Sequence, residues 1–288
     1  MNISIMTVSF PIDQETMEEI KQLVAEAETV DKVDYISLLS VGELSDFYTK
    51  GFCILAYDDD SERLVGMLTS IDRMATLDFE WSSVVLPSNR RLGIGERLVI
   101  ELGKNLEIRG ATADIGLTPG SSEAGRQLLH KFGYAFDFQE RTMVAAAEKV
   151  ELDSEVEVSR YTDEESEVVG ILVSAFGDTE EEARALVSFN TQTPHRHLMV
   201  AILRDEVVGT VTIVDEKEKL WVTGLAVHQN ARNNGVATLL LNWSKIEAYQ
   251  MEKASIYLDV ETDNAQALSI YEKARFSIWS HTHFYIKS

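Results

Sequence analysis

The sequence predicts a mixed α/β (α+β) fold that is built from two similar units in tandem, each a sheet flanked by helices. At 288 residues the chain is long enough for two domains of ordinary size. Segments with strand-like character alternate with segments of helical periodicity, which is typical of α/β architecture. The chain also repeats itself: shifted by 142 positions, residues 90–95 (RRLGIG) fall on residues 232–237 (RNNGVA).

The same offset aligns hydrophobic residues on both sides of this loop. These pairs are Phe79 with Trp221, Val85 with Val227 and Tyr134 with Phe276. Upstream, residues 64–66 (LVG) match residues 207–209 (VVG) with a slip of one residue, which we assign to the intervening turn. The repeat predicts two domains, 1–147 and 155–288, with a short polar linker around residues 146–155.

The first unit is expected to open with a strand and a helix, for which Asp13 and Thr16 are suitable N-terminal caps. Residues 30–50 predict one or two short helices. Pro87 and Pro119 are expected to end strands. The other predicted strands and helices of this unit are strands 3–10, 51–57, 63–71, 78–86, 111–117 and 136–145, and helices 13–27, 94–108 and 123–132.

The second unit repeats this order of elements. Asp205-Glu206 marks a turn between two of its strands. Its predicted strands are 156–161, 197–203, 207–214, 220–227, 255–260 and 277–286, and its helices are 164–176, 180–190, 236–250 and 264–273.

The segment around Gly235 has the features of an anion-binding turn. A hydrophobic strand, residues 220–227, leads through a polar loop into a helix that begins near Val236. Backbone N–H groups at the start of a helix lack partners within the helix, and the helix dipole adds partial positive charge there. Gly235 lets the backbone approach a ligand closely and Ala237 adds little bulk. The turn therefore suits a diphosphate.

This turn and a later stretch together resemble the GNAT family of acyl-CoA N-acyltransferases. Residues 232–237 match the family's acyl-CoA loop, Gln/Arg-x-x-Gly-x-Gly/Ala, at every specified position. The family's later block contains Asn, Ala, Tyr and Phe, which are matched by Asn264, Ala267, Tyr271 and Phe276. Arg275 departs from the pattern, since the family usually has Gly before the Phe.

The resemblance implies two tandem GNAT-like units, each with a mixed, mostly antiparallel sheet, and acetyl-CoA (coenzyme A) as the acyl donor. By resemblance, backbone groups of one strand pair with the pantetheine arm like an added strand. The residues expected to bind the donor are Leu225, Ala226, Val227, Arg232, Asn233, Asn234, Gly235, Val236, Ala237, Thr238 and Asn264, and in the first unit Val85, Arg90, Arg91, Leu92, Gly93, Ile94 and Gly95. Asn264 is equally suited to cap the helix that follows it.

Acyl transfer to an amine needs a donor that protonates the leaving thiolate and a route for the amine proton. The resemblance assigns the first role to Tyr271, whose phenol has an ordinary pKa near ~10, close to the ~8.5 of a thiol. The resemblance assigns no base on strand 220–227, because that strand has no carboxylate. Glu261 is the candidate that we retain, beside Asp259, His228 and a chain of water molecules.

The first unit retains the glycine loop but lacks the residues that correspond to Tyr271 and Asn264. Leu129 stands in the register of Tyr271 and Ser122 in that of Asn264. We therefore expect catalysis in the second unit, whereas the first either binds an acyl-CoA or only shares the fold.

Composition restricts the partners. The net charge of −22 disfavours nucleic acid and anionic membranes. The excess of acidic residues is accounted for by solubility, or alternatively by the attraction of a cationic acceptor such as an amine. The resemblance implies an amine acceptor, either a small molecule or a peptide. No apolar run reaches the ~18 residues of a membrane span. The single Cys53 excludes an internal disulfide and fits a cytoplasmic protein. No histidine pair has a third ligand at a fixed spacing, so we expect no metal site. An oligomer is compatible with the sequence.

The sequence therefore predicts an acyl-CoA-dependent N-acetyltransferase. The alternative is a non-catalytic acyl-CoA sensor, in which both units bind the ligand and neither turns it over. The absence of a carboxylate on strand 220–227 favours the sensor, and Tyr271 favours the enzyme.

Overall fold

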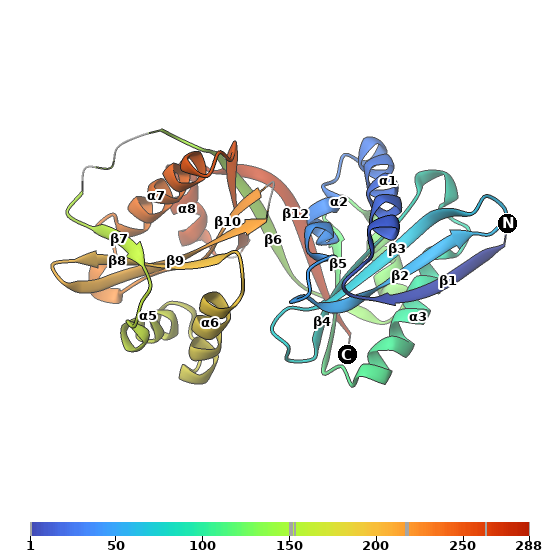
Figure 1. Ribbon diagram of the computed structural model, residues 1–288, viewed down its shortest axis with the longest axis horizontal. Coiled ribbons are helices and arrows are strands. Elements are labelled where there is room, and N and C mark those ends of the chain that lie inside the picture. The colour runs from blue at the N-terminus through green and yellow to red at the C-terminus, as the bar shows by residue number, and fades with distance from the viewer. Residues whose placement is uncertain (1, 150–151, 153, 217–218, 263, 288) are drawn as a thin grey trace. The chain divides into compact units, whose positions relative to one another are not determined.

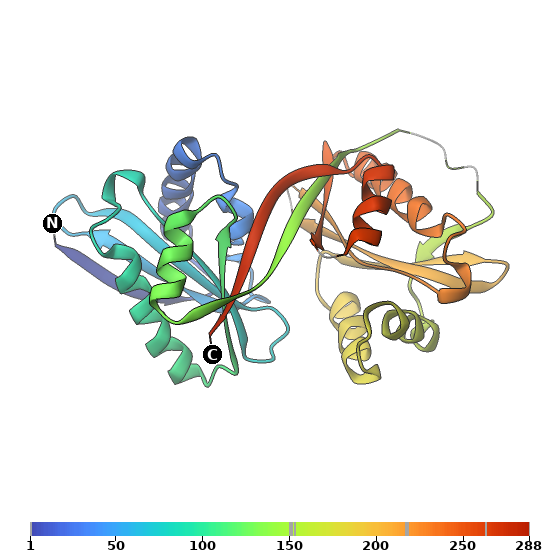
Figure 2. The same ribbon diagram turned by 180° about the vertical axis from the view of Figure 1, so that it is seen from behind.

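The structure is a computed structural model that describes residues 2–149, 152, 154–216, 219–262 and 264–287 (Figures 1 and 2). Strands and helices are interspersed along the chain and the sheet contains parallel and antiparallel pairs, which confirms the predicted mixed α/β class. The chain divides into two compact units. Unit 1 comprises Met1–Glu140 and Ser280–Ser288, and unit 2 comprises Arg141–Trp279.

Unit 1 contains the first five strands, the start of the sixth and the first four α-helices, in the order expected from the sequence. Residues 30–50, where one or two short helices are predicted, contain one short α-helix and one 3-10 turn. The elements are β1 (Ile3–Ser9), α1 (Gln14–Asp31), α2 (Tyr35–Leu38), η1 (Val41–Glu43), β2 (Lys50–Asp58), β3 (Arg63–Asp72), β4 (Asp78–Val85), η2 (Pro87–Asn89), α3 (Ile94–Arg109), β5 (Ala113–Pro119), α4 (Glu123–Lys131) and β6 (Tyr134–Ala146).

The strands of unit 1 lie in the order β1-β2-β3-β4-β5-β12-β6, where β12 (Ser277–Lys287) comes from the end of the chain. The pairs β1–β2, β2–β3, β3–β4 and β5–β12 are antiparallel, and β4–β5 is parallel. Helix α4 lies on the same side as α3 (Figure 2), and the side chain of Leu128 approaches Gly95.

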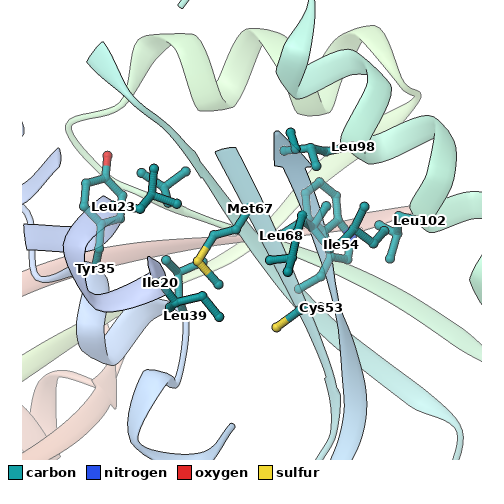
Figure 3. Packing of buried hydrophobic residues seen from close by; sticks show 14 of the residues in the cluster. Ile20, Leu23, Tyr35, Leu39, Cys53, Ile54, Met67, Leu68, Leu98 and Leu102 are labelled. Atoms are coloured by element: carbon teal, nitrogen blue, oxygen red, sulfur yellow. The ribbon is translucent and has the colours of Figure 1, made fainter. Parts of the chain in front are cut away.

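The core of unit 1 forms where helices pack on both faces of β2 and β3. Asp13 accepts a hydrogen bond from the backbone N–H of Thr16 at 3.0 Å, so the predicted cap of α1 is present. Ile20 of α1 and Leu98 of α3 are fully buried among strand residues (Figure 3). Cys53 is also fully buried, and burial raises the pKa of its thiol, so it behaves as a small apolar residue.

Unit 2 has the same sequence of elements, with α5 and α6 on one face of its sheet and α7 and α8 on the other (Figure 1). Helix α6 begins with a capping box, in which the Thr179 and Glu182 side chains each bond the other's backbone N–H. The elements are β7 (Glu157–Arg160), α5 (Glu165–Phe176), α6 (Glu180–Gln192), β8 (Arg196–Leu203), β9 (Glu206–Glu216), β10 (Lys219–Val227), η3 (Gln229–Ala231), α7 (Val236–Gln250), β11 (Ser255–Glu261), α8 (Ala265–Lys273) and the start of β12.

The strand order in unit 2 is β12-β6-β11-β10-β9-β8-β7. Leu220 and Val222 of β10 and Leu258 of β11 are buried in the core cluster under α7 and α8. Ala226 belongs instead to the cluster under α5 and α6. The pair β10–β11 is parallel and the pairs β8–β9 and β9–β10 are antiparallel.

Strands β6 and β12 are each divided between the units. Unit 1 holds β6 up to Glu140 and β12 from Ser280, and unit 2 holds the remainder of both strands. The sequence repeat places the division at the linker after residue 147, with all of β12 in the second domain. The units of the structure differ because strand pairing joins residues far apart in the chain, which periodicity and repeat spacing do not reveal.

The one-residue slip in the repeat lies inside a strand, so its assignment to the turn is wrong. Residue pairs Ile71–Glu80 and Ile213–Val222 enclose loops of equal length. The difference lies in the strands: residues 209–213 of β9 are five residues, and the equivalent residues 66–71 of β3 are six. A β-bulge compensates, since Gly224 and Leu225 of β10 lie opposite a single residue of β9.

Candidate functional site

The two repeated loops have the same backbone conformation. Gly235 has φ +82° and Asn233 has φ +64°, against +80° for Gly93 and +64° for Arg91. These positive angles turn the chain sharply from strand to helix, and glycine adopts them at little cost. No atom of the described residues beyond the chain neighbours lies within 4 Å of the position that a Cβ on Gly235 would take. The start of α7 is therefore open to a ligand.

Arg232 stabilises this loop from within. Its Nε donates to the carbonyl oxygen of Val227 at 3.1 Å, and a terminal nitrogen donates to the carbonyl oxygen of Ser174 at 3.1 Å. The guanidinium thus ties the loop to the end of β10 and to α5. In the same turn, Asn233, Asn234 and Gly235 are exposed. Val236 is buried, and Ala237 and Thr238 are half-buried.

Strand β10 separates from β11 just before the loop. Their paired register covers Leu220–Val222 with Ile256–Leu258, although both strands continue. Leu225, Ala226 and Val227 therefore lie past the last residue of β10 that pairs with β11. The bulge with Gly224, at φ +57°, lies at the start of this segment and locally disrupts the β9–β10 ladder. The predicted strand residues therefore offer backbone groups for an added extended chain.

Tyr271 lies on α8 and packs against the core under α7 and α8. Its ring centroid is 6.3 Å from that of Phe276. Burial raises the pKa of the Tyr271 phenol above its ordinary value, so the hydroxyl stays protonated far above neutral pH.

The two candidates beside α8 are exposed. The Asn264 side chain accepts a hydrogen bond from the backbone N–H of Ala267 at 3.0 Å, so the capping interpretation holds for its oxygen. Glu261 ends β11, and its carbonyl oxygen accepts from the Asn264 N–H at 3.2 Å. Asn264 therefore positions α8 directly after the end of β11.

The other candidate bases are engaged elsewhere. Asp259 accepts a hydrogen bond from the hydroxyl of Thr142 at 2.7 Å. The Nδ1 of His228 accepts from the backbone N–H of Asn230 at 3.3 Å, at the start of the 3-10 turn. Asp259 shares a face of β11 with Glu261, because buried residues alternate with both.

In unit 1 the corresponding fork between strands is filled. The β4–β5 register ends at Trp81 and Gly116, and a Cβ on Gly116 would lie 2.4 Å from a methyl carbon of Leu129. The Trp81 indole donates to Asp114 at 2.8 Å, and the Tyr134 hydroxyl donates to the same carboxylate at 2.7 Å. Leu129, in the register of Tyr271, is thus a packing residue.

The loop of unit 1 is also electrostatically different. Arg90 pairs with both oxygens of Asp31, which holds the pKa of that carboxyl below its ordinary value. Glu96 lies in the first turn of α3, where its charge opposes a bound anion, and pairs with Lys131. Val85, Arg91, Leu92, Gly93, Ile94 and Gly95 keep the loop geometry of the repeat.

None of the helices in the described ranges is long and apolar enough to cross a membrane. The same ranges contain no group of three or more His, Cys, Asp or Glu side chains placed to hold a metal ion.

The acetyltransferase (GNAT) family model matches residues 162–276. This segment therefore resembles a GNAT domain. It lies within unit 2 and contains the open loop, the bulged strand and Tyr271. A search of the curated proteins found no relative of this chain.

Solved structures of GNAT proteins resemble the chain along nearly its whole length. A GCN5-related N-acetyltransferase from Sphaerobacter thermophilus has a TM-score of 0.73 at 17% identity, covering 98% of this chain and 95% of that chain. A tandem GNAT protein from the clavulanic acid biosynthesis pathway has a TM-score of 0.70 at 14% identity, with 98% of both chains covered. A GNAT-family acetyltransferase from Colwellia psychrerythraea has a TM-score of 0.62 at 13% identity, covering 99% and 100%. The chain therefore has a tandem GNAT fold, as predicted.

Proposed function

We propose that the protein is an acyl-CoA-dependent N-acyltransferase, which transfers an acetyl group from acetyl-CoA to an amine of a small molecule or peptide. The observation that carries this proposal is the sequence of features in unit 2. Strand β10 ends its pairing with β11 at Val222, bulges at Gly224, and runs into an open anion-binding turn at Gly235. An extended chain with a diphosphate at one end matches these features in order.

The turn would hold the diphosphate of coenzyme A. Backbone N–H groups from Asn233 to Thr238 surround the start of α7, and no acidic residue lies in the first turn of that helix. Backbone groups of Leu225–Val227 would pair with the pantetheine arm. The thioester then lies near the bulge, where a backbone N–H can donate to the carbonyl oxygen as negative charge develops there.

Tyr271 is the proposed proton donor to the leaving thiolate. The amine nitrogen forms a bond to the thioester carbon, the carbon–sulfur bond breaks, and the phenol proton goes to sulfur. Glu261 is the proposed acceptor of the extra proton of the bound ammonium group, directly or through water, since it is exposed at the end of β11. After the neutral amine has attacked, the second proton that the nitrogen loses as the amide forms returns to the Tyr271 phenolate.

We assign the chemistry to unit 2 and a structural role to unit 1. Leu129 cannot donate a proton, and its side chain and Trp81 lie over Gly116 at the base of the fork. Glu96 adds negative charge at the start of α3, whereas Thr238 stands at that position in unit 2.

A thiol-release assay with acetyl-CoA and a mixed panel of amines tests the proposal. Wild-type protein should release thiol with at least one amine, and Gly235→Glu should not. Binding of coenzyme A without thiol release from any amine would identify an acyl-CoA sensor instead.

A further inference from the structure

A row of aromatic side chains crosses the face of unit 2 opposite α7 and α8. It consists of Trp221 on β10, Tyr257 on β11 and Trp279 on β12. The ring centroids of Trp221 and Tyr257 are 5.4 Å apart, and those of Tyr257 and Trp279 are 6.2 Å apart. The neighbours Leu220 and Ile256 point to the buried core instead. Trp279 is 53% exposed, and Trp221 and Tyr257 are half-buried, so this row is not a core.

The fold itself does not require these rings. At the offset of the repeat, unit 1 has Phe79, Ile115 and Asp137 at the positions of Trp221, Tyr257 and Trp279. Phe79 is only 4% exposed and packs in the core of unit 1. The same sheet is thus built without an exposed aromatic row.

The row lies directly beside the proposed reaction site. Trp221 and Tyr257 are register partners, and the β10–β11 register ends one pair later, at Val222 and Leu258. The bulge follows at Gly224. At ~3.3 Å per strand residue, the aromatic pair is roughly 7–13 Å from the bulge.

A positively charged side chain already lies close to the faces of two of these rings. The Nζ of Lys219 lies 5.1 Å from the ring centroid of Tyr257 and 5.9 Å from that of Trp221. The indole N–H of Trp221 donates to Glu216 at 2.8 Å, and Asp259 is the next residue on the same face of β11. Aromatic faces attract cations, and neighbouring carboxylates strengthen this attraction.

We propose that this face selects an aliphatic diamine as the acyl acceptor, an inference that rests on the proposed function of unit 2. One ammonium group replaces that of Lys219 over Trp221 and Tyr257, and the second amine reaches the fork beside Asp259. The distance from the rings to the bulge requires several methylene groups between the two nitrogens. The distal nitrogen keeps its proton, while the reacting amine forms the new carbon–nitrogen bond and passes its proton to the base.

The test compares 1,5-diaminopentane with 1-aminopentane, which has the same chain and lacks the second ammonium group. The diamine should have the lower KM. Trp221→Leu should raise the KM of the diamine roughly threefold to thirtyfold, the range of cation–π contacts, and change that of 1-aminopentane less than twofold. Lys219→Gln should lower the KM of the diamine, because it removes the competing cation.

Trp243→Leu is the control, since Trp243 packs against the core under α7 and α8 on the opposite face. It should leave the ratio of the two KM values unchanged. Equal KM values for both amines, or a diamine KM that Trp221→Leu does not raise, would overturn the inference while the acyltransferase proposal stands.

Calorimetric titration of 1,5-diaminopentane without acetyl-CoA separates the two ideas. Binding that Trp221→Leu weakens and Lys219→Gln strengthens supports the cation site even if no amine releases thiol. Diamine binding that neither substitution changes would refute it.

Discussion

Replacing Gly235 with glutamate tests where coenzyme A binds. At φ +82° a side chain costs roughly 1–2 kcal/mol of stability, and no described atom would clash with it. Gly93→Glu is a matched control, since Gly93 has φ +80° and equally open surroundings. Gly235→Ala adds the same strain without the charge. All three variants should therefore fold with similar stability.

The new carboxylate would lie at the diphosphate site. Two unit charges 4 Å apart repel by about 4 kcal/mol at an effective dielectric constant near 20. Exposure and salt reduce this, leaving roughly 1.4–2.8 kcal/mol, or about tenfold to a hundredfold in Kd. At a coenzyme A concentration a hundred times the wild-type Kd, ligand stabilisation should fall from about 2.7 kcal/mol to between about 0.4 and 1.4 kcal/mol.

Thermal unfolding with and without coenzyme A measures this difference. Wild type, Gly93→Glu and Gly235→Ala should show the full ligand-induced shift, and Gly235→Glu a much smaller one. A full shift in folded Gly235→Glu would place the site elsewhere. Loss of the shift in Gly93→Glu alone would move the ligand to unit 1.

Three further predictions concern the chemistry and the stability. Tyr271→Phe should lower kcat by roughly 10²–10⁴-fold with little change in the KM for acetyl-CoA, measured by thiol release; an unchanged kcat with chemistry rate-limiting excludes the phenol as the acid. Glu261→Gln should mainly lower kcat, whereas Asp259→Asn should mainly raise the acceptor KM; the reverse pattern would make Asp259 the base. The lowered pKa of Asp31 stabilises the protein above the ordinary carboxyl pKa, and this contribution is lost as pH falls through the folded-state value. Asp31→Asn should therefore lower the free energy of unfolding in urea by about 1–2 kcal/mol at pH 7 and by less at pH 3. An equal loss of stability at both pH values would refute the ion pair with Arg90 as its source.

Local signals in the sequence account for most of the secondary structure. Asp13 caps α1 because its side chain reaches the N–H of Thr16, and Gly110 ends α3 in a left-handed conformation that few other residues adopt. The loop around Gly235 is likewise visible, because its glycine spacing and the following helical pattern are both local.

Non-local pairing explains what the sequence does not reveal. The bulge at Gly224 arises because β9 is one residue shorter than β3 between equivalent partners, and only the register of two strands shows where the difference falls. The aromatic row has the same origin. Trp221, Tyr257 and Trp279 are separated in the chain and meet only because their strands belong to one sheet.

The division of β12 has a consequence for synthesis of the chain. Strand β5 pairs with β12 from Pro119–Thr282 to Ile115–Ile286. The sheet of unit 1 therefore cannot be completed until residues more than 160 positions further along the chain have been synthesised. While the ribosome translates unit 2, β5 has an open edge that a neighbouring nascent chain could occupy. A gene divided at the linker would yield an amino-terminal product that lacks this strand, whereas supplying residues 280–288 as a separate peptide should restore it.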